Sequence, residues 1–201
     1  MKELVLASNN KHKLEEIQNI LKDYIILSLE DIGFKEEIEE TGDTFKENSL
    51  IKARRVAEFS KKITIADDSG LCIDLLDGAP GVYSARYSTS GTDEDNLQKV
   101  LKNLNGKEST AKYVCVISLI DLEKREYTFT GECPGKIITK KQGIGGFGYD
   151  PIFFIESLKK TFAEISFEEK NKISHRKIAL DKLLNYLILS QGGDLEKDKV
   201  K

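Results

Sequence analysis

In the first half of the chain, short apolar runs alternate with segments whose apolar residues recur at helical spacing. The apolar runs, typical of buried strands, are residues 4–7, 25–27 and 63–66, and the helical segments cover about residues 11–21, 45–60 and 93–104. A strand that continues through a helix into a neighbouring strand makes a right-handed crossover, so the first strands are expected to be parallel. This half therefore predicts an α/β fold.

The pattern changes at about residue 110. One long strand is predicted over residues 111–120, a turn over 121–124, an alternating strand over 127–133 and a third strand over 135–138. This antiparallel meander favours a long mixed β-sheet flanked by helices, or a second lobe packed beside the first with a central cleft.

A last amphipathic helix is predicted after Ser174, and Gly192 and Gly193 are expected to end it. We therefore expect one domain over residues 1–193 with two lobes, the antiparallel one covering roughly 110–140. The charged residues 194–201 are expected to form a disordered tail.

Two adjacent carboxylates, Asp67 and Asp68, follow an apolar run and precede Ser69 and Gly70. Like charges repel, so neighbouring acids suggest a bound cation or a proton transfer. The alternative is a polar loop between two strands, in which Gly70 relieves the backbone at a turn. The stretch alone leaves both interpretations open.

Cationic and hydrogen-bonding residues gather where predicted helices begin. The first group is Ser8, Asn9, Asn10, Lys11, His12 and Lys13, the second is Lys170, His175 and Arg176, and Lys52 lies on the helix after the acidic segment 36–43. Asn9 or Asn10 can cap the first helix. Cations in a first turn oppose the helix dipole unless an anion binds there, although a solvated helix start would look the same.

Two further segments carry side chains whose role can be predicted from the sequence. Glu47 lies three residues after Thr44, which is the spacing of a capping box, so a structural role is available to it and the sequence does not assign it a catalytic one. In the glycine-rich window 143–151, the backbone can approach a ligand closely and Phe147 offers a flat surface. A flexible loop is the alternative there.

Composition narrows the class of partner. The 201 residues carry 32% charged side chains but a net charge of only −3, which argues against a nucleic-acid binder. Cys72, Cys115 and Cys133 show no zinc spacing and are expected to be buried thiols in a reducing compartment. Without an apolar run near 18 residues or a signal peptide, we expect no membrane partner and a cytoplasmic protein.

Together, the acidic and basic groups suit the hydrolysis of a polyphosphate. Oxygen ligands hold Mg²⁺, a carboxylate activates water, and lysines neutralise phosphate charge. No serine or cysteine nucleophile with a partner base stands out, so direct attack by water is favoured.

Seven motifs in order then identify a resemblance that extends from Leu4 to about Leu187. They are Ser8-Asn9-Asn10-Lys11-His12-Lys13, Glu40-Thr41-Gly42-Asp43-Thr44-Phe45, Glu47-Asn48-Ser49-Leu50-Ile51-Lys52-Ala53, Ala66-Asp67-Asp68-Ser69-Gly70-Leu71, Gly78-Ala79-Pro80-Gly81-Val82-Tyr83-Ser84-Ala85-Arg86-Tyr87, Gly146-Phe147-Gly148-Tyr149-Asp150-Pro151 and Ser174-His175-Arg176. The chain closely resembles the inosine triphosphate pyrophosphatase family. One departure is His12, which stands where many relatives have glycine.

The resemblance implies a homodimer that uses Mg²⁺ to cleave ITP, dITP or XTP into the monophosphate and pyrophosphate, with a long mixed sheet and a cleft between two lobes. It implies that Asp68 is the general base and a metal ligand, and that Glu40 also holds the metal. It implies that the substrate is bound by Ser8, Asn9, Asn10, Lys11, His12, Lys13, Lys52 and Ser69. Of these, Asn10, Lys13, Lys52 and Ser69 would contact its phosphates. Phe147, Gly148, Tyr149, Asp150, Lys170, His175 and Arg176 would contact the nucleotide, chiefly its base.

Two alternatives stay open at this point. One is a phosphohydrolase acting on other nucleotides, and the other is a non-catalytic nucleotide-binding module on the same fold. Selection of a 6-oxo purine would follow from a donor on His175 or Arg176, because adenine would leave that donor unpaired at about 1–3 kcal/mol. The sequence does not identify the group that rejects guanine.

Overall fold

The computed structural model describes residues 2–197. Within these residues the strands are β1 (Lys2–Leu6), β2 (Tyr24–Leu27), β3 (Thr64–Ile73), β4 (Ser109–Ile120), β5 (Glu126–Ile137), β6 (Phe153–Ile155) and β7 (Lys160–Thr161). They form one seven-stranded sheet in the order β2-β1-β3-β4-β5-β6-β7. β1 is parallel to β2 and to β3, and every later pair is antiparallel. The mixed sheet expected from the sequence is confirmed.

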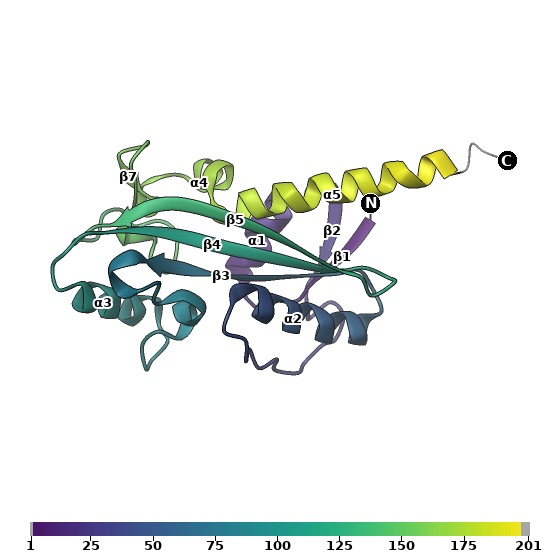
Figure 1. Cartoon of the computed structure of the whole chain (residues 1–201), viewed down its shortest axis with the longest axis horizontal. Coiled ribbons are helices and arrows are strands. Elements are labelled where there is room, and N and C mark those ends of the chain that lie inside the picture. The colour runs from purple at the N-terminus through teal and green to yellow at the C-terminus, as the bar shows by residue number, and fades with distance from the viewer. Residues whose placement is uncertain (1, 198–201) are drawn as a thin grey trace.

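Helices cover both faces of this sheet. They are α1 (Lys11–Ile20), α2 (Phe45–Ser60), α3 (Asp93–Leu104), α4 (Phe167–Ile173) and α5 (His175–Lys197), with short 3₁₀ helices η1 (Asp74–Leu76), η2 (Gly81–Arg86), η3 (Asp150–Ile152) and η4 (Phe162–Glu164). α2 and α3 lie on one face, and α1, α4 and α5 lie on the other (Figure 1). The long strands β3, β4 and β5 connect two groups of elements, one around α2 and β1 and one around α3 and β7 (Figure 1).

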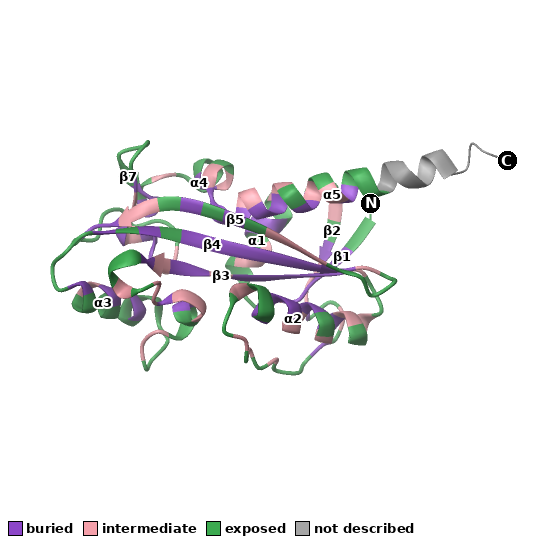
Figure 2. Ribbon diagram, in the orientation of Figure 1, coloured by how far each residue is buried: buried purple, intermediate pink, exposed green. Residues whose placement is uncertain are grey.

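The core follows from this covering of the sheet on both faces. Residues 113–120 of β4 are buried one after another, because neither face of that strand meets solvent. Figure 2 shows the same for most of β3 and β4. The buried apolar side chains form separate clusters, one between α2 and β1 and another between α5 and the strands.

The acidic stretch 67–70 is not a turn, so the alternative of a polar loop between two strands is wrong. β3 is one strand of ten residues, and each of them pairs with β4, from Thr64 opposite Ile120 to Ile73 opposite Ala111. The glycine has another purpose. A Cβ at Gly70 would lie 2.4 Å from Ser84 Oγ, so glycine allows η2 to pack directly against the strand.

The predicted third strand of the meander is also wrong, because β5 continues through Pro134 to Ile137. Proline has no backbone N–H to donate, so it fits a stretch of strand with one free edge. β6 pairs only with Lys136 and Ile137, which leaves the edge at Pro134 unpaired within the described sheet.

The last helix is longer than expected. α5 is described as far as Lys197 and passes Gly192 and Gly193. Glycine disfavours a helix by only about 1 kcal/mol relative to alanine, so two glycines need not end one. Residues 198–201 of the predicted tail lie outside the described residues. Among the helices of residues 2–197, none combines the length and the apolar character that crossing a membrane requires.

Candidate active site

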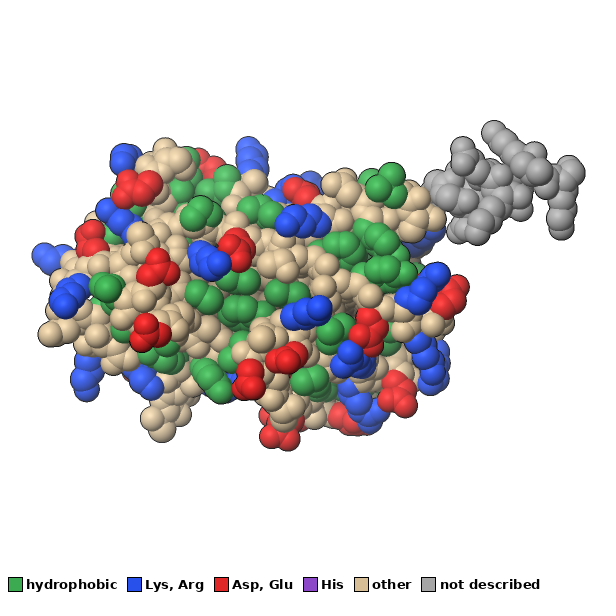
Figure 3. All heavy atoms as spheres, viewed as in Figure 1, with side chains coloured by type: hydrophobic (Ala, Val, Ile, Leu, Met, Phe, Trp, Pro, Cys, Tyr) green, Lys and Arg blue, Asp and Glu red, His purple; other side chains and the backbone are tan. Residues whose placement is uncertain are grey.

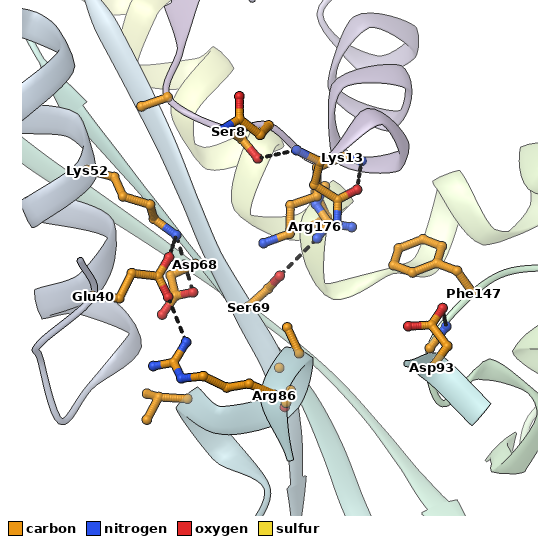
Figure 4. Close-up of a pocket in the computed structure, with 18 of the residues that line it drawn as sticks. Ser8, Lys13, Glu40, Lys52, Asp68, Ser69, Arg86, Asp93, Phe147 and Arg176 are labelled. Carbon is orange, nitrogen blue, oxygen red and sulfur yellow. Dashed lines mark hydrogen bonds and ion pairs between the residues drawn. The ribbon is translucent and has the colours of Figure 1, made fainter. Parts of the chain in front are cut away.

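A cavity of about 580 Å³ lies between the two groups of elements. Fifteen of the predicted site residues line it: Ser8, Asn9, Asn10, Lys13, Glu40, Lys52, Asp68, Ser69, Phe147, Gly148, Tyr149, Asp150, Lys170, His175 and Arg176. Figure 4 shows how several of them approach one another from β3, α2 and the first motif. Of the predicted residues, Lys11 and His12 are the two that the described lining does not include.

β3 separates the two aspartates. Successive side chains of a strand point to opposite faces, so Asp67 and Ser69 face one way and Asp68 the other. Asp67 meets Lys13 and Asp68 meets Lys52. The two acids therefore belong to different charge clusters, although they are adjacent in sequence.

Asp67 is completely buried and fully paired. Its carboxylate forms an ion pair with Lys13, accepts a hydrogen bond from Arg176 Nε at 2.8 Å, and accepts others from Ser69 Oγ at 3.0 Å and Cys115 Sγ at 3.1 Å. Burial by itself opposes ionisation, but Arg176 and Lys13 outweigh it and hold the pKa of Asp67 well below its usual value. Asp67 thus stays ionised and holds two cations in place.

Glu16 extends this cluster and was missed in the sequence. Its buried carboxylate accepts a hydrogen bond from Arg176 Nη1 and lies 3.7 Å from Lys170 Nζ. Lys170 Nζ also lies 2.5 Å from Asp150 Oδ2. The available signal was helical spacing, because Glu16 lies three residues after Lys13 and so shares its face of α1.

Asp68 lies in a different electrostatic environment. Its Oδ1 is 3.4 Å from Lys52 Nζ, and within the described part of the chain its buried Oδ2 has no hydrogen-bond partner. Desolvation raises the pKa of Asp68, against the opposing pull of Lys52 and Lys13, and the negative charges of Glu40 and Asp67 raise it further. Asp68 is therefore the more basic of the two aspartates.

Glu40 shares Lys52 with Asp68. Lys52 Nζ lies 2.5 Å from Glu40 Oε1, and Arg86 Nη1 lies 3.3 Å from Oε2. Burial raises the pKa of Glu40, but Lys52 and Arg86 reverse this and leave it lowered. Glu40 therefore stays ionised beside Asp68. Arg86 is a further lining residue that was not singled out in the sequence.

The start of α2 holds the acidic loop that carries Glu40. Thr44 and Glu47 form the predicted capping box, so the structural role of Glu47 is confirmed. Gly42 N donates a hydrogen bond to Asn48 Oδ1 at 2.8 Å. These contacts fix the backbone two residues from Glu40.

At the far end of the cavity the glycine-rich loop is tied down at several points. Phe147 N donates to Asp150 Oδ2 at 3.0 Å, Gly148 N donates to Asp93 Oδ2 at 2.8 Å, and Tyr149 Oη donates to the Ser84 carbonyl at 2.7 Å. The loop is thus an ordered wall of the cavity.

His175 forms part of the same end. Its ring stacks on Tyr113 with centroids 4.7 Å apart and an interplanar angle of 10°. Burial, together with Arg176 and Lys170, holds the pKa of His175 well below its usual value, so the imidazole is neutral. Its Nδ1 has no hydrogen-bond partner in the part of the chain that the structure describes.

His12 contacts the glycine-rich loop from outside the cavity. Its ring stacks on Phe147 with centroids 5.0 Å apart and an interplanar angle of 9°. Lys170 Nζ lies 4.5 Å from the centroid of the same Phe147 ring. Phe147 is therefore held by two side chains from different helices.

The chemistry of this cavity suits an anionic ligand with a divalent cation. Among residues 2–197, no group of three or more metal-ligating side chains is present, so protein ligands alone do not form a complete cage. Glu40 and Asp68 are nevertheless two carboxylates at one ammonium, and Asp68 Oδ2 is buried without a partner. Mg²⁺ is commonly bound by one or two carboxylates, with water and phosphate completing its shell, so these residues fit it.

Comparison with known proteins gives consistent matches. The model of the Ham1 family matches residues 4–186. The dITP/XTP pyrophosphatase of Thermoanaerobacter sp. (strain X514) is 48% identical over 191 residues, covering 92% of this chain and 96% of the relative. The dITP/XTP pyrophosphatase of Bacillus subtilis (strain 168) is 47% identical over 193 residues, covering 93% and 98%.

Solved structures agree with these matches. The Staphylococcus aureus Ham1 protein gives a TM-score of 0.86 at 41% identity, covering 94% of this chain and 100% of that one. A structure from Mycobacterium abscessus described as "Nucleoside-triphosphatase / dITP/XTP pyrophosphatase" gives 0.75 at 38% identity, covering 90% and 98%.

Proposed function

The chain belongs to the Ham1 family, and from this premise we propose that it hydrolyses dITP, ITP and XTP to the monophosphate and pyrophosphate. The relatives named dITP/XTP pyrophosphatase, which match more than nine tenths of the chain, support this activity. They also confirm the resemblance that the seven motifs carry. The observation on which the proposal chiefly rests is the division of the cavity into a basic side around Asp67 and a carboxylate side around Asp68.

Asp68 is the proposed general base. A carboxylate with a raised pKa accepts a proton more readily than a fully paired one, and Oδ2 of Asp68 has no other hydrogen-bond partner among the described residues. Asp67 cannot take this role, because its pKa is held well below the usual value. Asp68 would take a proton from water as its oxygen attacks a phosphorus atom of the anhydride between the α- and β-phosphates. The P–O bond of that anhydride would break and release the monophosphate and pyrophosphate, without a covalent enzyme intermediate.

Glu40 and Asp68 are the proposed Mg²⁺ ligands. When bound, the ion would neutralise charge on the phosphates and polarise the P–O bond that breaks. Lys52 lies between these two carboxylates and Lys13 lies against Asp67, so both ammonium groups would face the phosphate chain. Asn10 caps α1 by accepting from Lys13 N at 3.2 Å, which places this helix start beside the same anions.

His175 is the better placed of the two proposed donors to a 6-oxo purine. Arg176 already donates to Asp67, Glu16 and Ser69 through all three of its nitrogens. The neutral His175 imidazole can donate from one nitrogen and accept at the other. Its stacking on Tyr113 fixes the plane of the ring, which favours one direction for the hydrogen bond.

A homodimer in the cytoplasm is also proposed. Hydrophobic side chains gather on the face shown in Figure 3. Among the described residues, Leu122, Ile188 and Leu189 are large apolar side chains that expose 66%, 57% and 76% of their surface. Exposed apolar side chains of this kind suit contact with a second copy of the chain. Light scattering after gel filtration would give twice the mass of 22.6 kDa, whereas a monomer would refute the dimer.

Product analysis tests the activity. The enzyme is incubated with ITP, XTP, ATP or GTP and Mg²⁺, and the nucleotides, pyrophosphate and orthophosphate are separated. We expect IMP or XMP with one pyrophosphate each, slow turnover of ATP and GTP, and none after chelation. Release of orthophosphate in place of pyrophosphate, or equal rates with ATP and ITP, would refute the proposed activity.

Replacement of Asp68 tests the assignment of the base. Asp68→Asn should lower kcat by about 10²–10⁴-fold, the range of general base catalysis, while ITP binding stays within a few fold. Asp181→Asn provides a control, because Asp181 forms only an exposed ion pair with Lys177. Near-normal turnover of the Asp68 variant would show that another group activates water.

A further inference from the structure

Arg86 differs from the other paired cations that line the cavity. The side chains of Lys13, Lys52, Lys170 and Arg176 are 15%, 12%, 6% and 2% exposed, whereas that of Arg86 is 45% exposed. The first four are thus nearly enclosed and held against carboxylates. Arg86 lies at the open side of the cavity, on η2.

The contacts that hold Arg86 are weak. Its Nη1 lies 3.3 Å from Glu40 Oε2, which is long for a charge-assisted hydrogen bond. Its guanidinium lies 5.3 Å from the centroid of the Tyr83 ring. Exposed ion pairs of this kind contribute little to stability, so Arg86 can leave Glu40 at small cost.

Glu40 does not depend on Arg86 for its charge partner. Lys52 Nζ lies 2.5 Å from the other oxygen of Glu40 and is itself nearly enclosed. Figure 4 shows Arg86 reaching from η2 to Glu40 and Asp68, with the cluster around Lys13 on the other side of these two carboxylates. The guanidinium therefore lies within the cavity lining, beside the two carboxylates that are proposed to hold Mg²⁺ and next to which the phosphates would lie.

We propose that Arg86 is a phosphate-binding residue that moves from Glu40 to the pyrophosphate end of the bound triphosphate. A guanidinium presents its donors as a planar fork that matches two phosphate oxygens, which an ammonium cannot do. Arg86 enters from the exposed side, whereas the groups around His175 and Phe147 at the far end face the base. Its contacts would thus fall on the β- and γ-phosphates and would assist departure of pyrophosphate.

The inference rests on the proposed function and predicts a specific difference between ligands. Binding is measured by calorimetry in the presence of a chelator, so that no turnover occurs. Arg86→Ala should weaken binding of ITP and of inorganic triphosphate about tenfold, which corresponds to about 1.4 kcal/mol, and leave binding of IMP unchanged. Arg86→Lys should recover part of the loss, because the charge remains and the fork does not.

Arg55→Ala is the matched control. The Arg55 side chain is 42% exposed, close to the value for Arg86, and it pairs with another glutamate of the acidic segment, Glu36. Unlike Arg86, it does not line the described cavity. The Arg55→Ala variant should bind ITP, inorganic triphosphate and IMP as tightly as the wild type does. An equal loss for ITP and IMP in Arg86→Ala, or no loss for ITP, would overturn the inference.

The two proposals fail in different ways. If the wild type shows no preference for ITP over ATP, the proposed substrate class fails, but the loss of triphosphate binding in Arg86→Ala still supports its role. If the wild type makes IMP and pyrophosphate and Arg86→Ala binds inorganic triphosphate normally, only the role of Arg86 fails. If the wild type binds neither ITP nor inorganic triphosphate, both are wrong.

Discussion

Substitution of each adjacent aspartate by asparagine should change stability in opposite directions. Asp67→Asn removes the charge that holds Lys13 and Arg176, whereas Asp68→Asn removes a charge whose burial is poorly compensated. The first variant should be less stable than the wild type. The second should be at least as stable, as is common where a catalytic group is kept in an unfavourable environment.

The size of the Asp67 effect follows from its contacts. Breaking a buried ion pair by removing one partner costs about 3–5 kcal/mol. Arg176 keeps Glu16 as a partner and Lys13 is partly exposed, so the low end, about 3 kcal/mol, applies. For a chain of this length 1 kcal/mol corresponds to about 2–4 °C in Tm, so the expected drop is roughly 6–12 °C.

The pH dependence of stability should likewise differ in sign between Asp67 and Asp68. The pKa of Asp67 is lowered in the fold, so its stabilisation is present above the unfolded value of 3.8 and is lost as pH falls through the folded value. The pKa of Asp68 is raised, so its stabilisation is present below 3.8 and is lost as pH rises through the folded value. The stability advantage of Asp68→Asn should therefore shrink on acidification.

The assay is thermal and urea unfolding of both variants at one protein concentration and without ligand, with Asp181→Asn as the exposed control. The control should stay within about 0.5 kcal/mol of the wild type. If Asp68→Asn lost as much stability as Asp67→Asn, the claim that the two carboxylates occupy opposite environments would be refuted.

Two further predictions concern the walls of the cavity. Gly70→Ala should destabilise the protein by about 1–3 kcal/mol, seen as a lower urea midpoint, because its Cβ would lie 2.4 Å from Ser84 Oγ and 2.5 Å from the Gly81 carbonyl oxygen. An unchanged midpoint would contradict the tight packing of η2 on β3. The ring proton signals of His175 should not titrate between pH 5.5 and about 7.5 by NMR, because its pKa is held well below the usual value. A midpoint near pH 6.5 would show that the ring is not enclosed as described.

Features that depend on neighbouring residues along the chain could be predicted from the sequence. Thr44 caps α2 as its spacing predicted, and Asn10, one of the two candidates, caps α1. At the start of the predicted last helix, the Ser174 hydroxyl accepts from Lys177 N at 3.1 Å. Capping joins groups only three residues apart, so the sequence contains both partners. Strand β4 could be predicted for a similar reason, because the apolar residues that indicate it follow one another along the chain.

The course of β3 could not be predicted in this way. Polar residues and a glycine between two apolar runs are typical of a turn, yet residues 67–70 continue the strand. Tertiary structure decides this, because β4 supplies backbone partners along the whole strand and Lys13, Arg176 and Lys52 compensate the carboxylates. None of these partners is near residues 67–70 in the sequence.

The same reasoning explains the missed residues. Glu16 is an ordinary charged residue within a predicted helix, and nothing in its local sequence distinguishes it from a solvated side chain. Arg86 lies in the motif from Gly78 to Tyr87, but its charge alone did not assign it a role. Glu16 joins the buried cluster around Asp67 because α4 and α5 bring Lys170 and Arg176 to it from more than 150 residues away. Contacts between residues so far apart in the sequence become visible only in the three-dimensional structure, although the motifs identified the segments that form the cavity.

The adjacency of the two aspartates has a physical consequence for the proposed base. Asp67 remains charged because Arg176 and Lys13 compensate it. Desolvation is the main cause of the raised pKa of Asp68, and the negative charges of Glu40 and of Asp67, on the opposite face of the strand, add to it. Asp67 therefore has two effects, since it holds the cations that would meet the phosphates and it makes the neighbouring carboxylate more basic. A neutral residue at position 67 would release the cations and lower the pKa of Asp68 together. The pair is thus a functional unit in which the buried, fully paired aspartate supports the one that is left free to accept a proton.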